Sequence, residues 1–408
     1  MPVRICTGFE QGYDNAGGSW EKGNAGNRFC DTRLGAPNHT TSTPRSGSRC
    51  LEINQSAAVE HISWTADTLT ASQTFCVFNF WFRFPTLPSA DVVIVNVWSL
   101  GGDINFVFRN SDDVVLLNNE TTGTNSVGPI VVADTWYHVE ISIDYTAAGT
   151  ADWTIDGTAQ TQLTDTPAST TLVACLLGAE DAQTMHCLYD DVVIWTDTSA
   201  IGGYPFGKQS VKLLIADTGG TTAEIGTANA TGRMVTNSAI DATHNSANIL
   251  TAISEVPPLI GATATGVGQR TSGAGNAVGI PMTSYTLVGS EAISGIRILV
   301  VGWAGSTTAN NIGMRTFNGT TETILFAAAD PNFDNNTTAS AWLCKMVTPA
   351  NFDTQSELDA LVVRLGYSTD IAPLPGAHAI YAEVAIKEST AAPAVKNPSF
   401  VSQYGSYL

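Results

Sequence analysis

The chain has 408 residues, carries a formal net charge of −19, and only 13% of its residues are charged. Compact domains usually hold about 100–200 residues, so this length predicts two domains with small additions. There are 18 Lys and Arg residues against 37 Asp and Glu residues. We therefore expect neither nucleic acid nor an anionic membrane as a partner, because both are bound through clustered cations.

The low charge content indicates an all-β protein. Globular chains usually contain about 25% charged residues, and long exposed helices need them on their outer faces. Exposed strands and turns use Thr, Ser and Asn instead. No window of the sequence reaches the roughly 18 apolar residues of a membrane span, and the residues after Met1 lack the basic start and apolar core of a secretory signal. We therefore expect a soluble protein that is made in the cytoplasm.

The cysteines give no metal signature. The chain has seven of them, at positions 6, 30, 50, 76, 175, 187 and 344. No pair has the Cys-x-x-Cys spacing of a zinc or redox site. Cys76 and Cys175 lie within apolar, strand-like runs and are predicted to be core residues. An odd number of cysteines in a reducing compartment favours free thiols, although bridges could form later in an oxidising medium.

The first strong strand signal is Phe75–Phe84, whose alternating and largely aromatic residues fit a buried sandwich strand. A Gly- and Pro-rich start and one short strand, at Arg49–Ile53, precede it. The next expected strands are Val92–Leu100, Ile104–Phe108, Val114–Leu117 and Ile130–Val132. Their spacing is typical of a meander or a sandwich.

The segment Trp136–Tyr145 has the clearest two-faced strand pattern. Its apolar face consists of Tyr137, Val139, Ile141, Ile143 and Tyr145, and its polar face of Trp136, His138, Glu140, Ser142 and Asp144. We predict that the apolar face packs into the core and that the polar face is solvated. The dipeptide Asp156-Gly157 supplies the positive φ angles of a two-residue hairpin turn. Strands at Thr171–Leu177 and Cys187–Trp195 complete this half.

The pattern changes after about residue 200. Thr354 and Glu357 have the spacing of a capping box, which predicts one short helix. The expected strands of this half are Lys212–Ala216, Ile293–Trp303, Ile312–Phe317, Thr321–Phe326 and Ala379–Ile386, with a hairpin turn at Asn318-Gly319. We divide the chain into a first β-sandwich at 1–200, a connector and loop-rich start of a second module at 201–284, a C-terminal β-sandwich at 285–388 and an extended tail at 389–408.

Four segments of the first half resemble a known family. They are the aromatic strand Phe78–Phe84, the strand opening at Trp136-Tyr137-His138, the hairpin Trp153–Gly157, and the late strand Tyr189–Trp195 with its paired acids. In kind and order they are similar to laminin-G-like, or concanavalin-like, jelly-roll domains. The resemblance covers roughly residues 1–200 and implies a jelly-roll sandwich there.

The second half resembles, more loosely, the β-modules of tail and capsid-surface proteins of tailed bacteriophages. The strand Ile293–Trp303, the Asn318-Gly319 hairpin and the segment Leu361–Tyr367 carry this likeness. It implies a virion structural protein, either a capsid-surface decoration or a tail appendage, made in the host bacterial cytoplasm. We expect it to form a homo-oligomer, predicted to be a trimer, and to contact other virion proteins such as the major capsid or tail proteins.

Concanavalin-like folds also serve glycoside hydrolases, whose catalysis needs a pair of carboxylates at a defined distance. Glu140 and Asp144 share a face, but positions four apart on a strand lie about 13 Å from each other. Paired glycosidase carboxylates need about 5–9.5 Å. The sequence therefore predicts no catalytic residues and no enzyme.

Several acidic, amide and histidine side chains are candidate metal ligands or catalytic groups. Asp190 and Asp191 could bind calcium, but adjacent strand residues point to opposite faces, so we favour a structural role for Asp190, such as bonding a neighbouring loop. Asp103, Asn118 and Asn119 are further possible oxygen ligands, without a recognisable loop. His61, His138 and His186 stand beside no nucleophile signature. We assign no metal or cofactor-binding residue and no cofactor, with calcium kept open.

Two alternatives to the virion role remain. The jelly-roll resemblance and surface aromatics that could stack on sugars favour a glycan-binding adhesin, which is compatible with a virion protein. A polysaccharide hydrolase is the third hypothesis.

Overall fold

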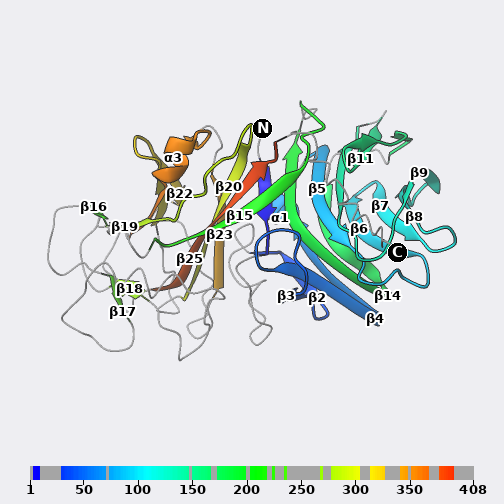
Figure 1. The fold of residues 1–408 in the computed structure, drawn as a ribbon, viewed down its shortest axis with the longest axis horizontal. Helices are drawn as coiled ribbons and strands as arrows, with labels where there is room; N and C mark the ends of the chain where they lie inside the picture. The colour runs from blue at the N-terminus through cyan, green and yellow to red at the C-terminus, as the bar shows by residue number, and fades with distance from the viewer. Residues whose placement is uncertain are drawn as a thin grey trace, which may run out of the picture.

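In the computed structural model of the chain, the described residues are 3–9, 29–69, 73–146, 149–166, 172–198, 203–217, 223–225, 234–236, 267–269, 277–303, 313–326, 341–347, 351–366 and 376–389. They form mostly β-strands, with two short helices, α1 (Ala66–Leu69) and α3 (Gln355–Asp359). The predicted all-β class with sandwich modules is confirmed. Figure 1 shows two β lobes that lie side by side.

The first lobe, the N-terminal sandwich, contains the strands before residue 200. They are β1 (Val3–Thr7), β2 (Thr32–Leu34), β3 (Asn38–Thr40), β4 (Cys50–Thr65), β5 (Phe75–Arg83), β6 (Val92–Ser99), β7 (Gly102–Arg109), β8 (Val114–Asn119), β9 (Thr124–Ile130), β10 (Tyr137–Asp144), β11 (Thr150–Ile155), β12 (Thr158–Ala159), β13 (Leu163–Thr164) and β14 (Leu172–Asp197).

The second lobe, the C-terminal sandwich, contains the later strands. They are β15 (Gln209–Ile215), β16 (Ala223–Ile225), β17 (Met234–Thr236), β18 (Val267–Gln269), β19 (Ala277–Pro281), β20 (Ala292–Trp303), β21 (Gly313–Phe317), β22 (Glu322–Phe326), β23 (Ala341–Val347), β24 (Val362–Gly366) and β25 (Gly376–Lys387). Strands β15 to β19 thus lie in the region 201–284, which the sequence pattern presented as a connector and loop-rich start.

The 26-residue strand β14 organises the N-terminal sandwich. Its first half pairs with β6, and its second half pairs with β5, so it belongs to both layers. We call these the β6 layer, in the order β14-β6-β7-β8-β9, and the β5 layer, in the order β14-β5-β10-β11-β12. Strand β4 accompanies β14 along most of both halves, with a register shift between Ala179 and Gln183. Just before it, Gly178 has φ +93°, and a Cβ there would lie 2.4 Å from the carbonyl oxygen of Glu60.

Aromatic side chains fill the space between the two layers. The ring of Phe80 on β5 lies 5.8 Å from that of Phe106 on β7, which in turn lies 5.9 Å from the ring of Trp153 on β11. The Tyr145 hydroxyl, just after β10, donates a 2.9 Å hydrogen bond to the Val97 carbonyl on β6. Tyr145 is fully buried, and with it the apolar face of β10 lies in this core as predicted, except that Tyr137 is only partly buried.

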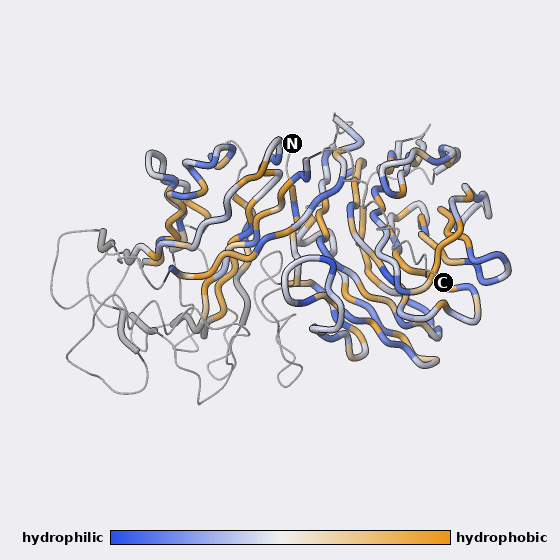
Figure 2. The backbone as a smooth tube through the Cα atoms, in the orientation of Figure 1, coloured by the Kyte–Doolittle hydropathy of each residue, from blue (hydrophilic) through white to orange (hydrophobic). Residues whose placement is uncertain are grey.

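The C-terminal sandwich has one sheet in the order β17-β18-β25-β20-β23, with β15 on β25, and a second in the order β16-β19-β24-β21-β22. Ile298 and Val300 of β20 belong to the core of this sandwich, whereas Leu299 and Val301 belong to a cluster that extends from the N-terminal sandwich. A strand that is buried on both faces is apolar without alternation. This explains the continuous apolar run of β20, which Figure 2 shows as an orange stretch in the middle of the molecule.

A buried charged pair lies in the seam between the lobes. Arg297 and Glu383 are register partners on β20 and β25, and both side chains are almost fully buried. The guanidinium of Arg297 donates a 2.8 Å hydrogen bond to the Phe29 carbonyl. The carboxylate of Glu383 accepts hydrogen bonds from the Thr7 hydroxyl at 2.8 Å and the Gly8 amide at 3.2 Å. The three groups that hydrogen-bond to this pair, those of Phe29, Thr7 and Gly8, all belong to the N-terminal lobe. The pair itself lies on strands of the C-terminal lobe, so these bonds connect the two lobes.

The predicted turns and helix are confirmed. Asp156 and Gly157 have φ +49° and +81° between β11 and β12. Asn318 turns the chain between β21 and β22, where its side chain accepts a 2.7 Å hydrogen bond from the amide of Thr321. Thr354 caps α3 in a capping box with Glu357. The tail predicted at 389–408 lies outside the described residues apart from 389. Within the described part of the chain, no helix is long and apolar enough to cross a bilayer.

Candidate functional site

The polar face predicted for β10 is covered by the chain itself. Trp81 on β5 donates from its indole nitrogen to the Gln209 carbonyl at 3.0 Å, and the Asn79 amide donates to the Gly207 carbonyl at 3.0 Å. The Phe206 ring lies 4.6 Å from that of Trp195 on β14. We call the surface formed by Asn79, Trp81, His138 and Glu140 the covered face. The segment that leads into β15 lies over it.

Glu140 is the acid at the centre of the covered face. Its carboxylate is fully buried and accepts hydrogen bonds from the amides of Phe206 at 2.6 Å and Gly207 at 3.0 Å. Burial raises the pKa of Glu140 to about 7, against the lowering effect of these two amides, of the Lys387 charge and of Asn79. The solvated face predicted for β10 is therefore wrong at this position. Ser142 and Asp144, nearer the end of the strand, are half-buried.

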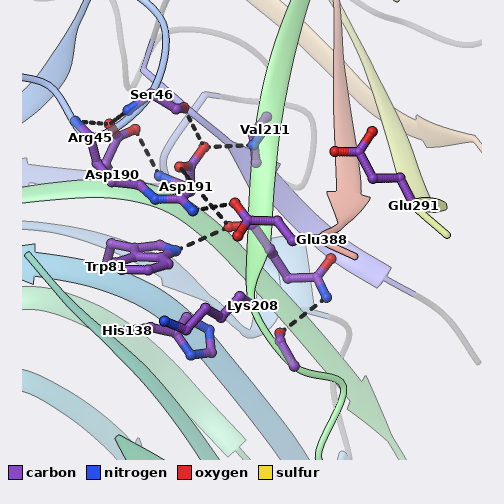
Figure 3. Close-up of polar contacts among 12 residues, drawn as sticks. Arg45, Ser46, Trp81, His138, Asp190, Asp191, Lys208, Val211, Glu291 and Glu388 are labelled. Atoms are coloured by element: carbon purple, nitrogen blue, oxygen red, sulfur yellow. Dashed lines mark hydrogen bonds and ion pairs between the residues drawn. The ribbon is translucent and has the colours of Figure 1, made fainter. Parts of the chain in front are cut away.

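His138 lies next to Glu140 on the same face and is also fully buried. Its Nε2 lies 3.0 Å from the Asn79 side-chain oxygen. Burial, followed by the charges of Lys208 and Arg45, lowers the pKa of His138 to about 3. The imidazole therefore stays neutral over the physiological range. Figure 3 shows His138 below Trp81, with the Lys208 side chain beside it.

Asp190 and Asp191 meet the same loop, although neighbouring strand residues were expected to point to opposite faces. The register between β14 and β5 shifts after Asp190, and Asp191 has φ +50°. Asp190 accepts from the amide of Arg45 at 3.0 Å and from that of Ser46 at 3.2 Å. Asp191 accepts from the Arg45 guanidinium at 2.6 Å and from the Val211 amide at 2.5 Å. The two side chains do not point to opposite faces, because a bulge at Asp191 changes the direction of its side chain.

These contacts make the aspartates structural. Arg45 pairs with Asp191 and with Glu388, and its guanidinium lies 3.9 Å from the centre of the Trp81 ring (Figure 3). Asp190 holds the 45–46 loop, as the sequence predicted, and Asp191 joins that loop to β15 of the other lobe. Among the described residues, no group of three or more His, Cys, Asp or Glu side chains could hold a metal ion.

The other sequence candidates are dispersed. His61 contacts the Ala179 carbonyl at 3.1 Å, and His186 contacts the Glu52 carboxylate at 2.8 Å. Asn119 is fully buried, and its side-chain oxygen accepts from the Thr121 amide at 3.0 Å, which shapes the turn after β8. Asp103 and Asn118, in contrast, lie on a different surface.

That surface is the outward side of the β6 layer, which we call the open face. Four asparagines on β6, β7, β8 and β9 are successive register partners: Asn96, Asn105, Asn118 and Asn125. The amide of Asn96 donates to Asn105 at 2.8 Å, and that of Asn118 donates to Asn125 at 2.7 Å. Burial decreases along the row, from 6% exposure at Asn96 to an exposed Asn125. Because each asparagine lies directly opposite the next one on the neighbouring strand, the row crosses the sheet at right angles to the strands.

Trp98 and Asp103 form the neighbouring row of the open face. They are register partners on β6 and β7, and the Trp98 side chain is 38% exposed. Asp103 accepts a 3.0 Å hydrogen bond from Asn96, and Asn105 donates at 3.1 Å to Glu120. Burial raises the pKa of Asp103, against the lowering effect of the Asn96 bond, and the charges of Glu120 and Glu180 raise it further.

Asp103 and Asn118 were predicted from the sequence as possible metal ligands, whereas Trp98 and the other asparagines of the row were not predicted. A signal was present, because Asn96 and Trp98 alternate with core residues on β6 and Asn105 does so on β7. The register that aligns these residues across four strands could not be predicted from the sequence. The open face thus combines an exposed indole with a row of groups that can both donate and accept hydrogen bonds.

Comparison with known proteins yields structures but no sequence family. No protein-family model and no curated protein matches the chain. Domain 4 of AbnA, an arabinanase from Geobacillus stearothermophilus solved with arabinotriose, is 18% identical, and the match covers 48% of this chain and 92% of that one with a TM-score of 0.34. The endo-β-1,4-glucuronan lyase of Trichoderma reesei is 12% identical over 43% and 94%, with a TM-score of 0.33. A Bacillus subtilis protein of unknown function with a galectin-like fold is 10% identical over 39% and 86%, with a TM-score of 0.29.

These proteins share a β-sandwich of the jelly-roll kind. The likeness agrees with the predicted concanavalin-like fold, and it concerns the fold alone. None of the three descriptions names a phage. The prediction that the chain is not an enzyme is contradicted, because sandwiches of this kind include polysaccharide lyases and a domain of a glycoside hydrolase.

Proposed function

We propose that the chain is a glycan-binding protein and that its N-terminal sandwich holds an oligosaccharide on the open face. The observation that carries this proposal is the half-exposed indole of Trp98 opposite Asp103, beside the asparagine row. A sugar ring has an apolar face that packs on an aromatic ring and a rim of hydroxyls that need donors and acceptors. Trp98 would supply the first and the asparagine and aspartate side chains the second.

The charge of the open face narrows the glycan class. The charges of Glu120 and Glu180 both raise the pKa of Asp103, so three acidic side chains lie close together on this side of the sandwich. Like charges across an interface oppose binding. The ligand would therefore be an uncharged glycan or one with amino sugars, in contrast to a chain of uronic acids.

A glycan array, run with and without calcium, tests the proposal. The strongest ligand is then titrated calorimetrically against the wild type, Trp98→Ala and Ile324→Ala. Loss of a central aromatic contact typically costs about 2 kcal/mol, so Trp98→Ala is expected to weaken binding more than tenfold. Ile324, 59% exposed on the C-terminal sandwich, is the matched control and should have no effect. Absence of any glycan ligand, or equal affinity of all three proteins, would refute the assignment.

Self-assembly as a virion component is a second candidate, and one surface favours it. Three apolar side chains are exposed on and just after the edge strand β9: Val127 by 47%, Ile130 by 65% and Val132 by 53%. Exposed apolar patches at sheet edges favour association. We propose that they contribute to a homo-oligomer, as predicted from the sequence, and that the protein contacts other virion proteins. Light scattering after gel filtration tests this: a trimer that Ile130→Lys dissociates is expected, and a wild-type monomer at micromolar concentration would count against it.

A further inference from the structure

Two thiols meet in the core of the N-terminal sandwich. Cys76 lies on β5, and Cys175 lies on the first half of β14, within the β6 layer. Their sulfur atoms are 3.6 Å apart, and both side chains are fully buried. The pair therefore spans the two layers of the sandwich.

Both cysteines are held in place by strand pairing on each side. Cys76 is the register partner of Ile143 on β10 and of Thr196 on β14. Cys175 is the register partner of Trp64 on β4 and of Val97 on β6. Because four ladders fix the two backbones, the sulfurs remain neighbours whenever the sandwich is folded. A disulfide needs a sulfur separation of about 2.05 Å, and rotation of the two side chains is the motion that shortens the distance.

The contacts of other buried cysteines are different. The Cys6 sulfur contacts the Glu383 carbonyl at 3.5 Å, and the Cys187 sulfur contacts the Leu188 carbonyl at 3.6 Å. Cys187 lies on the same strand as Cys175 and is equally buried. It is therefore a matched cysteine for comparison.

We propose that Cys76 and Cys175 are a disulfide-forming pair that cross-links the two layers when the protein meets a small-molecule disulfide such as oxidised glutathione. One cysteine thiolate attacks the oxidant, which forms a mixed disulfide and releases one glutathione thiolate. The second cysteine then attacks the sulfur of the first and releases the second glutathione. The two cysteines lose two electrons and two protons, and oxidised glutathione becomes two reduced molecules.

Access decides when this reaction takes place. Both thiols are buried in the core. Burial raises the pKa of Cys175 well above the ordinary cysteine range, and the neighbouring Cys76 raises it further by a smaller amount. Thiolates are the attacking species, so the closed sandwich reacts slowly. The cross-link forms while the sandwich folds or opens, in an oxidising medium.

The test is to refold the reduced protein from urea in a mixture of oxidised and reduced glutathione. Remaining thiols are blocked with N-ethylmaleimide under denaturing conditions, and the digested protein is analysed by mass spectrometry. We expect a linked peptide that joins Cys76 and Cys175, two hydrogens lighter than the sum of its parts, and N-ethylmaleimide on the other five of the seven cysteines. The cross-link closes a loop of roughly 100 residues, which should raise the melting temperature by about 10 °C over the same protein in reductant.

The variants make the result specific. Cys76→Ala should lose both the linked peptide and the rise in melting temperature, whereas Cys187→Ala should keep both. N-ethylmaleimide on both Cys76 and Cys175 in wild-type protein that has refolded under oxidising conditions would overturn the proposal, and so would a bridge from either of them to another cysteine. The wild-type peptide analysis decides the matter even if Cys76→Ala does not fold.

Discussion

The buried carboxyl of Glu140 makes a quantitative prediction about stability and pH. Its pKa is raised from 4.5 to about 7 in the folded protein, mainly by burial. A group whose pKa is raised on folding favours the folded state in its protonated form. This contribution is complete below pH 4.5 and is lost as the pH rises through about 7. The difference between the two values corresponds to about 3 kcal/mol.

Glu140→Gln isolates this effect because glutamine has a similar shape and carries no charge at any pH. The free energy of unfolding of the wild type and the variant is measured by urea titration from pH 4.5 to pH 8, with tryptophan fluorescence as the signal. All other titrating groups are shared by the two proteins. The wild-type value minus the variant value should therefore fall by about 3 kcal/mol across this range. The constant offset between the two proteins, which includes the loss of one of the two oxygen acceptors for the amides of Phe206 and Gly207, does not affect this change with pH.

Ser142→Ala is the control, because Ser142 lies on the same side of β10 and does not titrate. Its pH profile should run parallel to that of the wild type. A parallel profile for Glu140→Gln as well would show that the carboxyl is not desolvated by the segment leading into β15, and the reasoning on the covered face would fail.

Substitutions at three further positions test other parts of the fold. Arg45→Ala leaves the buried carboxylate of Asp191 without its cation and should cost about 3 kcal/mol in urea unfolding, whereas a change below the experimental error would show that the Arg45–Asp191 pair does not stabilise the fold. Gly178→Ala forces a Cβ to within 2.4 Å of the Glu60 carbonyl oxygen at a φ of +93° and should cost about 2 kcal/mol, seen as a lower melting temperature. Thr354→Ala removes the cap of α3 and should cost about 1 kcal/mol, whereas Thr354→Ser should restore most of it.

Local features of the fold were predictable from the sequence. The alternation of Val139, Ile141 and Ile143 identified the core side of β10, because strand geometry places every second residue on one face. Asp156-Gly157 and the Thr354 cap were predictable for the same reason, since their geometry is determined within a few residues. The open face was predictable only in part. Polar and apolar residues alternate along each of its strands, but only the register between the strands brings the polar residues into rows.

Features that depend on distant parts of the chain were not predictable. Nothing around Glu140 indicates that residues more than sixty positions away cover it, and a polar strand face is ordinarily solvated. The bulge at Asp190 and Asp191 breaks the alternation on which the sequence argument relied. The run of apolar residues in β20 was recognised as a strand, but its burial on both sides requires a second lobe.

Packing on both sides of β20 and β25 also determines how the molecule can present a ligand. Domains joined by small polar contacts move relative to each other by default, but here apolar side chains and the Arg297–Glu383 pair fill the space between the lobes. We therefore expect the two lobes to move as one body. In that case the direction in which Trp98 faces is set relative to the C-terminal lobe, and a surface that binds that lobe also orients the indole.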